Sequence, residues 1–155
     1  MTDASKLSFE IAGFKLTVMG RQFSDAQDFW DGNWLNVLCE CKASGARVEA
    51  QGPLVHLSEM AELLKGLEAL SEGNCKKANV DFIEPELGLR FEVGSRGDLK
   101  FEVRLTPNAL EQSHRFDFAI DLSYLPSAIG QCRAILDAYP KRGVVEESRL
   151  TTLGD

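Results

Sequence analysis

Residues 25–41 read D-A-Q-D-F-W-D-G-N-W-L-N-V-L-C-E-C, and the fold prediction starts from this stretch. It holds both tryptophans of the chain and a turn signal, Asp31-Gly32-Asn33, that runs directly into an apolar segment. From Trp34 to Cys39 the residues are apolar at both alternating positions, and Asn36 is the one interruption. A strand that is apolar on both faces is typical of the centre of a sheet covered on both sides. The stretch therefore predicts a central strand that is entered through a polar loop.

Alternation of apolar and polar residues predicts further strands on both sides of this one. The pattern recurs at 7–11, 14–18, 46–51, 80–82, 87–93, 99–105 and 115–122. Short turns rich in glycine join most of these segments, which favours antiparallel neighbours. Gly52-Pro53 is expected to end the strand that begins at residue 46.

Two stripes of apolar residues at helical spacing predict two amphipathic helices. The first is expected over about 58–71, with Ser58 as its N-cap and Gly73-Asn74 at its end. Gly66 inside it costs about 1 kcal/mol relative to alanine and predicts a close contact with another backbone. The second helix is expected to have Pro126 in its first turn and to stop at Pro140.

The predicted order is four strands and a helix, followed by four strands and a helix, which indicates an α+β fold of mainly antiparallel, curved sheets packed with two helices. A chain of 155 residues can bury about 70% of its unfolded surface, so residues 1–140 are expected to form a single domain. Residues 141–155 have no sustained periodicity and are expected to form a mobile tail. The strand order is left open by these patterns. The predicted core consists of Leu35, Val37, Leu63, Leu67, Leu89, Phe91, Phe101, Phe118, Ile129 and Leu136.

The charge of the chain bears on its partners. Seventeen basic and twenty-four acidic residues give a net charge of −7, which repels nucleic acid and anionic lipid and favours a basic protein as partner. The sequence lacks a run of about 18 apolar residues and the features of a signal peptide, so a cytosolic protein with no membrane association is expected.

Neither the cysteines nor the histidines form a catalytic or metal-binding motif. Cys39 and Cys41 lie on one side of one strand without a second pair nearby, so buried reduced thiols are expected at all four cysteines and no metal or cofactor. His56 and His114 lie outside any motif with a nucleophile or a metal ligand, and Ser113 and His114 would point to opposite faces of a strand. The chain is therefore not expected to be an enzyme.

Asp25, Asp28 and Asp31 recur at a spacing of three in the loop before the central strand, and Trp30 lies among them. This spacing does not fit a calcium loop of the EF-hand type. One interpretation is that the carboxylates satisfy backbone amides of the loop and that both tryptophans are core residues. The other is an exposed acidic patch with Trp30 as an aromatic anchor, which is typical of protein-binding sites. Both remain open, and the binding hypothesis names Asp25, Asp28, Trp30 and Asp31.

Two segments of the sequence resemble those of a known family. The D-x-x-D-G-N-W-L segment at 28–35 and the F-I-E-P-x-L segment at 82–87, in this order of elements over 7–140, resemble WapI-type immunity proteins. The resemblance implies a small cytosolic bacterial protein that binds a wall-associated polymorphic toxin, and it implies no catalytic residues.

The sequence thus predicts a non-enzymatic immunity-type protein that binds and neutralises a bacterial toxin domain. A basic cleft in such a toxin would suit an acidic inhibitor of this size. The alternative is an accessory or small-ligand-binding domain without a toxin partner.

Overall fold

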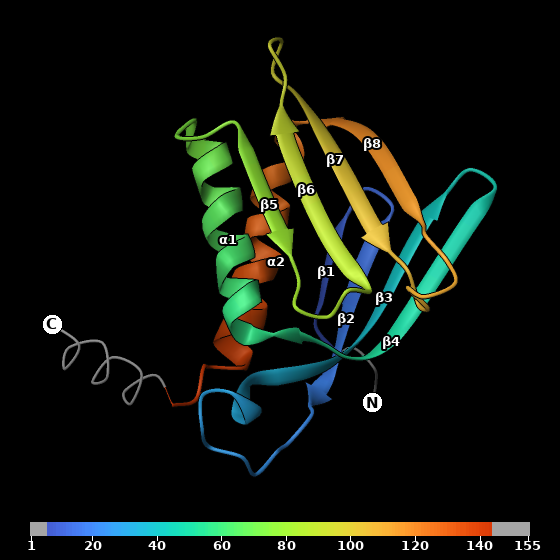
Figure 1. Ribbon diagram of the computed structural model, residues 1–155. Helices are drawn as coiled ribbons and strands as arrows, with labels where there is room; N and C mark the ends of the chain where they lie inside the picture. Colours follow the sequence, from blue (N-terminus) through green and yellow to red (C-terminus); the bar gives the residue numbers. More distant parts are fainter. Residues whose placement is uncertain (1–5, 144–155) are drawn as a thin grey trace, which may run out of the picture.

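The computed structural model describes residues 6–143, and two four-stranded antiparallel sheets form its frame (Figure 1). The first sheet contains β1 (Ser8–Ile11), β2 (Phe14–Arg21), β3 (Trp34–Ala43) and β4 (Ala46–His56) in that order. The second contains β5 (Lys77–Asp81), β6 (Leu87–Val93), β7 (Asp98–Leu105) and β8 (Arg115–Asp121). Helix α1 (Leu57–Glu72) follows the first sheet and α2 (Leu125–Ala138) the second. The predicted α+β class and the order ββββα-ββββα are confirmed.

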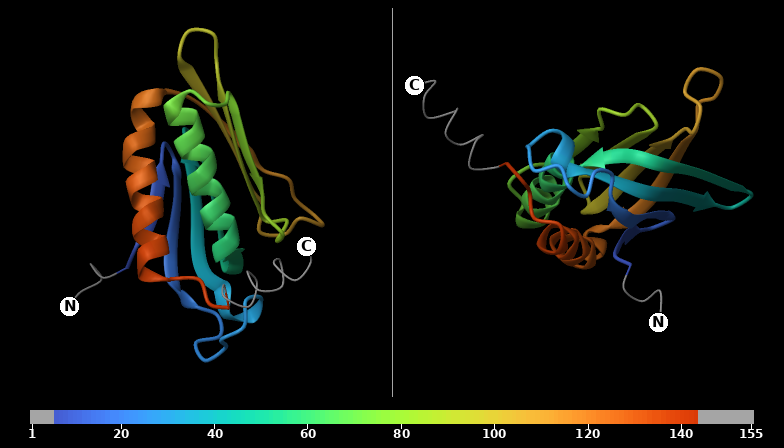
Figure 2. Two further views of the ribbon diagram at one scale, coloured as in Figure 1. Left: turned by 90° about the vertical axis from the view of Figure 1, so that its left-hand side faces the viewer. Right: turned by 90° about the horizontal axis from the view of Figure 1, so that it is seen from below.

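The two helices lie side by side and close one side of the space between the sheets (Figure 2). Helix α1 runs along β5, and a close contact is present at Gly66, because a Cβ atom there would lie 2.9 Å from the Cβ of Ala78; the contact is with this side-chain methyl, whereas a contact with another backbone was expected. Helix α2 runs along β1, where the Gln131 side chain accepts a hydrogen bond from the Glu10 N–H and donates one to the Glu10 carbonyl. The edges of both sheets that face the helices are therefore covered.

The core lies between the two sheets and the helices. Most of the predicted core residues are buried, but Phe118 and Leu136 are only half-buried and pack against the core from its margin. Phe118 is half-buried because β8 is the edge strand of its sheet. Stacking on Phe101, with ring centroids 5.9 Å apart, still joins Phe118 to the core.

Strand β3 is central in its sheet, as predicted, but it is not covered on both faces. Leu35, Val37, Cys39 and Cys41 are buried, whereas Asn36, Leu38 and Glu40 on the other face are only half-buried. An antiparallel sheet needs only one face on the core, so apolar residues on the second face are not a reliable sign of a second layer.

Two expected boundaries were wrong. Strand β4 does not end at Gly52-Pro53 but continues to His56, because it is an edge strand and the register of the β3–β4 pair shifts at this place, where proline is tolerated. Helix α1 begins at Leu57 with His56 rather than Ser58 as its N-cap. Helix α2 has Pro126 in its first turn and ends before Pro140, as predicted.

Residues 144–155 of the predicted mobile tail lie outside the described residues. Within residues 6–143, no helix is both long enough and apolar enough to cross a membrane.

Candidate protein-binding surface

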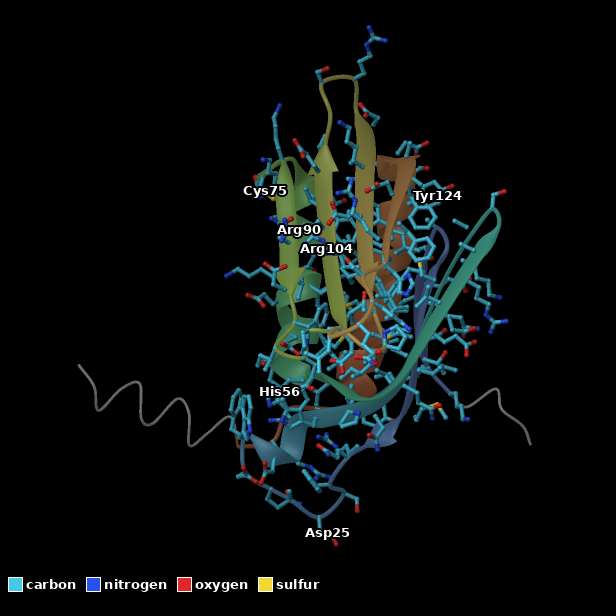
Figure 3. The ribbon with its side chains drawn as sticks, turned by 45° about the vertical axis from the view of Figure 1, so that its right-hand side comes forward. Asp25, His56, Cys75, Arg90, Arg104 and Tyr124 are labelled. Atoms are coloured by element: carbon cyan, nitrogen blue, oxygen red, sulfur yellow. The ribbon has the colours of Figure 1, made fainter. Side chains whose placement is uncertain are left out.

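The loop between β2 and β3 places all four predicted binding residues on the surface at one end of the molecule. Asp25, Asp28 and Asp31 are exposed, and Trp30 keeps 49% of its surface accessible. Figure 3 shows Asp25 at this end, beyond His56. Among residues 6–143, none of the three carboxylates takes part in an ion pair. The loop therefore presents negative charge and an aromatic side chain together.

The three carboxylates differ in their local bonding. Asp28 Oδ2 accepts a hydrogen bond of 2.9 Å from the Asp31 N–H, and the Asp28 carbonyl accepts one from Gly32. Turn chemistry thus explains Asp28, as one of the two interpretations proposed. The described part of the chain gives the carboxylates of Asp25 and Asp31 no hydrogen-bond partner, and it contains no group of three or more His, Cys, Asp or Glu placed to hold a metal ion.

An aromatic cluster supports the loop from inside. The ring of His56 lies 5.1 Å from those of Trp30 and Trp34 and 5.2 Å from that of Phe29. Trp34 is a core residue with 7% of its surface exposed, whereas Trp30 stacks on the His56 ring and remains half-exposed. Trp34 is thus a core residue, as the first interpretation has it, whereas Trp30 is exposed, which the first interpretation does not expect and the second requires.

His56 is fully buried and connects the loop to the start of α1. Its Nδ1 accepts hydrogen bonds from the Ser58 N–H at 3.2 Å and from the Ser58 hydroxyl at 2.7 Å. Because Nδ1 accepts, the proton lies on Nε2, which donates to the carbonyls of Phe29 (3.2 Å) and Trp30 (3.1 Å). The contact with Ser58 is a helix cap, since the same nitrogen accepts from the backbone of that residue.

Glu59 extends this connection to the loop between β5 and β6. Its two carboxylate oxygens accept hydrogen bonds from the N–H of His56 (2.9 Å) and of Ile83 (2.8 Å). Burial raises the pKa of this carboxyl, and the two N–H groups act in the opposite direction. Because both oxygens are occupied, Glu59 has a structural role. It brings the two segments on which the family resemblance rests to the same helix N-terminus.

Residues 139–143, here called the C-terminal strap, run back from α2 and hold the loop from the other side. The Asn33 side chain, which is fully buried, donates to the carbonyls of Phe29 and Arg142 and accepts from the Arg142 N–H at 2.8 Å. The Arg142 guanidinium donates to the carbonyls of Ser24 and Ala26, both at 2.8 Å. The part of the predicted tail that is described is thus bonded to the loop.

Arg21 and Gly143 complete the attachment of the strap. The Arg21 guanidinium donates to the carbonyls of Gly32 and Pro140, both at 2.6 Å, and lies 5.8 Å from the ring centroid of Tyr139. Gly143 has a φ of 72°, and a Cβ atom there would lie 2.5 Å from the Phe29 nitrogen, so no larger residue fits. The loop is therefore fixed by side chains rather than by strand pairing.

A concave region of about 540 Å³ lies over the outer face of β5–β8. Its charged residues are mixed in sign, and some of them pair, as Arg115 does with Asp117 at 3.0 Å and with Glu102 at 3.7 Å. Such exposed pairs contribute about 0–1 kcal/mol each. This face has the properties of a solvated sheet surface.

The buried thiols offer no reactive group. Cys39, Cys41 and Cys132 are buried, as predicted, and burial raises the pKa of each to about 12. Cys75, which was also expected to be buried, is only half-buried, because it lies in the turn between α1 and β5. A thiol that stays protonated at neutral pH is a poor nucleophile.

Several residues of this surface could not be selected from the sequence. His56 and Glu59 form a capping box, but the pattern that marks such a box has Ser or Thr at the N-cap, and Ser58 was expected there. No sequence pattern near Asn33 or Arg142 indicated that these two residues, 109 positions apart, are hydrogen-bonded to each other. Ile83, with 55% of its surface exposed, was visible only as part of the second family segment.

Residues 7–140 of the chain match the immunity protein WapI-like family. None of the curated proteins matches this chain. Among solved structures, one that is similar is a chain from crystal structures of Trypanosoma bruciei MRP1/MRP2, with 13% sequence identity and a TM-score of 0.45, and the similarity covers 87% of this chain and 84% of that chain.

Proposed function

Because this chain belongs to the immunity protein WapI-like family, we propose that it is a non-enzymatic immunity protein that binds a bacterial toxin domain in the cytosol and neutralises it. The family in general implies a protein partner. An inhibitor that binds directly over the active site of a toxin needs no catalytic activity of its own. The absence of a catalytic motif in the sequence agrees with this role.

The observation that carries the proposal is the way Trp30 is presented. A half-exposed indole that stacks on a buried histidine is held in place before a partner arrives, so little conformational entropy is lost on binding. Tryptophan is enriched among the residues that dominate binding energy at protein interfaces. We therefore propose that the loop with Asp25, Asp28, Trp30 and Asp31 forms part of the contact surface.

The acidic charge supports a basic partner. With a net charge of −7, the protein attracts a positively charged surface over distances of about 10 Å at ordinary ionic strength. Toxin domains that cleave nucleic acid need a basic cleft for their substrate. A carboxylate-bearing loop that enters such a cleft would exclude the substrate and add electrostatic steering to the encounter.

The test asks whether this protein neutralises the toxin domain that is encoded beside its gene. The toxin domain is expressed from an inducible promoter with and without this protein, and survival is counted. The purified pair is then analysed by size-exclusion chromatography and titration calorimetry. We expect survival only with the protein present and a stable complex of the two chains.

Killing that is unaffected by this protein, together with the lack of a complex, would contradict the proposal. In that case the accessory-domain alternative would take its place. Survival without a complex would also count against direct binding, since it would require an indirect mechanism.

A further inference from the structure

Two exposed apolar side chains come from distant parts of the sequence, on loops that are both bonded to the start of α1. Trp30 comes from the loop before β3, at the lower end in Figure 1, and Ile83 from the loop between β5 and β6, at the lower end of the second sheet. Two buried side chains, His56 and Glu59, connect the backbones of the two loops. His56 bonds the Trp30 carbonyl, and Glu59 bonds both the His56 N–H and the Ile83 N–H. The start of α1 thus sets the position of one loop relative to the other.

The backbone that carries each of these exposed side chains is held by a hydrogen bond to a buried side chain. Trp30 keeps 49% and Ile83 55% of their surfaces accessible, while their backbone groups are bonded to the buried His56 and Glu59. Phe23, which is 46% exposed, adds a third apolar side chain on the first loop. An exposed apolar patch with polar residues around it is typical of an interaction site, and side chains on a fixed backbone lose little freedom when a partner covers them.

The charges around these side chains indicate which partner fits. Asp25, Asp28 and Asp31 are exposed on the first loop, and Glu84 lies beside Ile83. The guanidinium groups of Arg21 and Arg142 are turned onto backbone carbonyls of the loop. Lys141 of the C-terminal strap is an exposed basic residue. A partner surface with basic side chains around an apolar recess would complement this arrangement.

We infer that the two loops form one docking surface, defined by Phe23, Asp25, Asp28, Trp30, Asp31 and Ile83, and that it binds a basic protein face. The inference rests on the proposed function, in which that face belongs to the toxin domain. It adds that the interface spans the N-terminus of α1 and includes the second loop. The partner is a protein and not a nucleic acid, because the exposed carboxylates repel phosphate.

The test replaces Ile83 by two residues of opposite charge. Ile83→Glu and Ile83→Lys both remove the apolar contact, but only lysine places a positive charge against a basic partner. The probe is the purified toxin domain encoded beside the gene, and affinities are measured by titration calorimetry. We expect Ile83→Glu to weaken binding by about tenfold, as for a moderate contact residue. Ile83→Lys should weaken it by about a further tenfold, because like charges then meet.

A matched control comes from the far side of the molecule. Leu122, also an exposed aliphatic residue, lies in the short 3-10 helix before α2 that ends at Tyr124, and Figure 3 shows Tyr124 far from Asp25, toward the other end of the molecule. Leu122→Lys should bind the toxin domain like the unchanged protein. Thermal melting of all three variants separates loss of binding from loss of folding.

Failure of the proposed function and failure of the proposed docking surface give different results. If the unchanged protein binds the toxin domain and both Ile83 variants bind it as tightly as the unchanged protein does, the proposed function stands and the second loop lies outside the interface. If Ile83→Lys binds as well as Ile83→Glu or better, the partner face is not basic. Hydrogen exchange of the unchanged complex gives a result that needs no variant: protection at 22–33 together with 82–84 is expected, and protection of only one segment overturns the inference.

Discussion

Trp30 and Trp34 belong to one aromatic cluster, but of the two only Trp30 is exposed. Replacing Trp30 by alanine should raise the rate of dissociation from the toxin domain by about 30-fold, which corresponds to about 2 kcal/mol for a true anchor. Surface plasmon resonance measures this rate directly. The association rate should change less, because the indole carries no charge.

Tyr124→Ala is the control for Trp30→Ala, since Tyr124 is an aromatic residue with a similar exposed fraction, 43%, at the other end of the molecule. It should leave both rates unchanged. A Trp30→Ala protein that melts like the original and dissociates at the original rate would remove the loop from the interface. A variant that simply unfolds would show that Trp30 is a structural residue.

His56 is expected to matter for stability. His56→Ala leaves two loop carbonyls and the Ser58 N–H without partners and opens a cavity among three aromatic rings. We expect the free energy of unfolding to fall by about 2–4 kcal/mol, measured by urea denaturation. His114→Ala is the matched comparison, because the His114 side chain bonds only the exposed Gln112, and the hydrogen bonds of its backbone are kept in the variant, so stability should change by less than about 0.5 kcal/mol. Equal effects of the two substitutions would mean that His56 does not hold the loop in place.

At the scale of elements, the C-terminal strap is an attachment that the loop depends on. Arg142→Met keeps the length of the side chain but removes the donors to the carbonyls of Ser24 and Ala26. We expect a loss of about 1 kcal/mol in stability and faster amide exchange within residues 22–33, detected by mass spectrometry. Sheet residues should exchange as before.

Lys141→Met provides the comparison for Arg142→Met. Lys141 is the exposed neighbour in the same strap, and its replacement removes the same charge. Exchange in the loop that is equally fast in both variants would show that charge, rather than the two hydrogen bonds, governs the loop.

The sequence predicted most elements because each of them has a local signal. Alternation marks a strand with one buried face, as in β7, where Leu99, Phe101 and Val103 are buried between exposed or half-exposed residues. Boundaries were less certain because they depend on neighbours. Whether Pro53 ends β4 depends on its edge position in the sheet, and whether Ser58 or His56 caps α1 depends on what surrounds the histidine ring.

The candidate surface was predictable only in part for the same reason. Composition identified the loop with Asp25 and Trp30, because carboxylates and indoles are locally visible. The supports of this loop come from β4, from α1 and from the C-terminal strap, and no local pattern connects them to it. Long-range pairing of this kind depends on the arrangement of the sheets, which a single sequence does not specify.

The arrangement of the whole molecule places charge unevenly with respect to the proposed interface, and this leads to a prediction about rates. Replacing Asp25, Asp28 and Asp31 by asparagine keeps the side chains nearly the same size, and asparagine at residue 28 can still accept the hydrogen bond from the Asp31 N–H. The association rate with a basic toxin domain should fall by about tenfold at low salt, and its dependence on salt should become flatter. Stopped-flow mixing at several salt concentrations measures both effects, and the dissociation rate should change less.

The control removes three negative charges from the opposite end of the molecule. Glu72 ends α1, and Glu92 and Asp98 flank the turn between β6 and β7, so all three lie at the upper end in Figure 1. The triple variant Glu72→Gln, Glu92→Gln, Asp98→Asn changes the net charge by the same amount as the loop variant. If steering comes from the loop, this control should associate at nearly the original rate at about 0.1 M salt, where the loop variant should still be slower, because interactions beyond about 10 Å are screened at this salt concentration. Equal slowing in both variants would mean that only the total charge acts on the encounter, and the acidic loop would then have no special place in it.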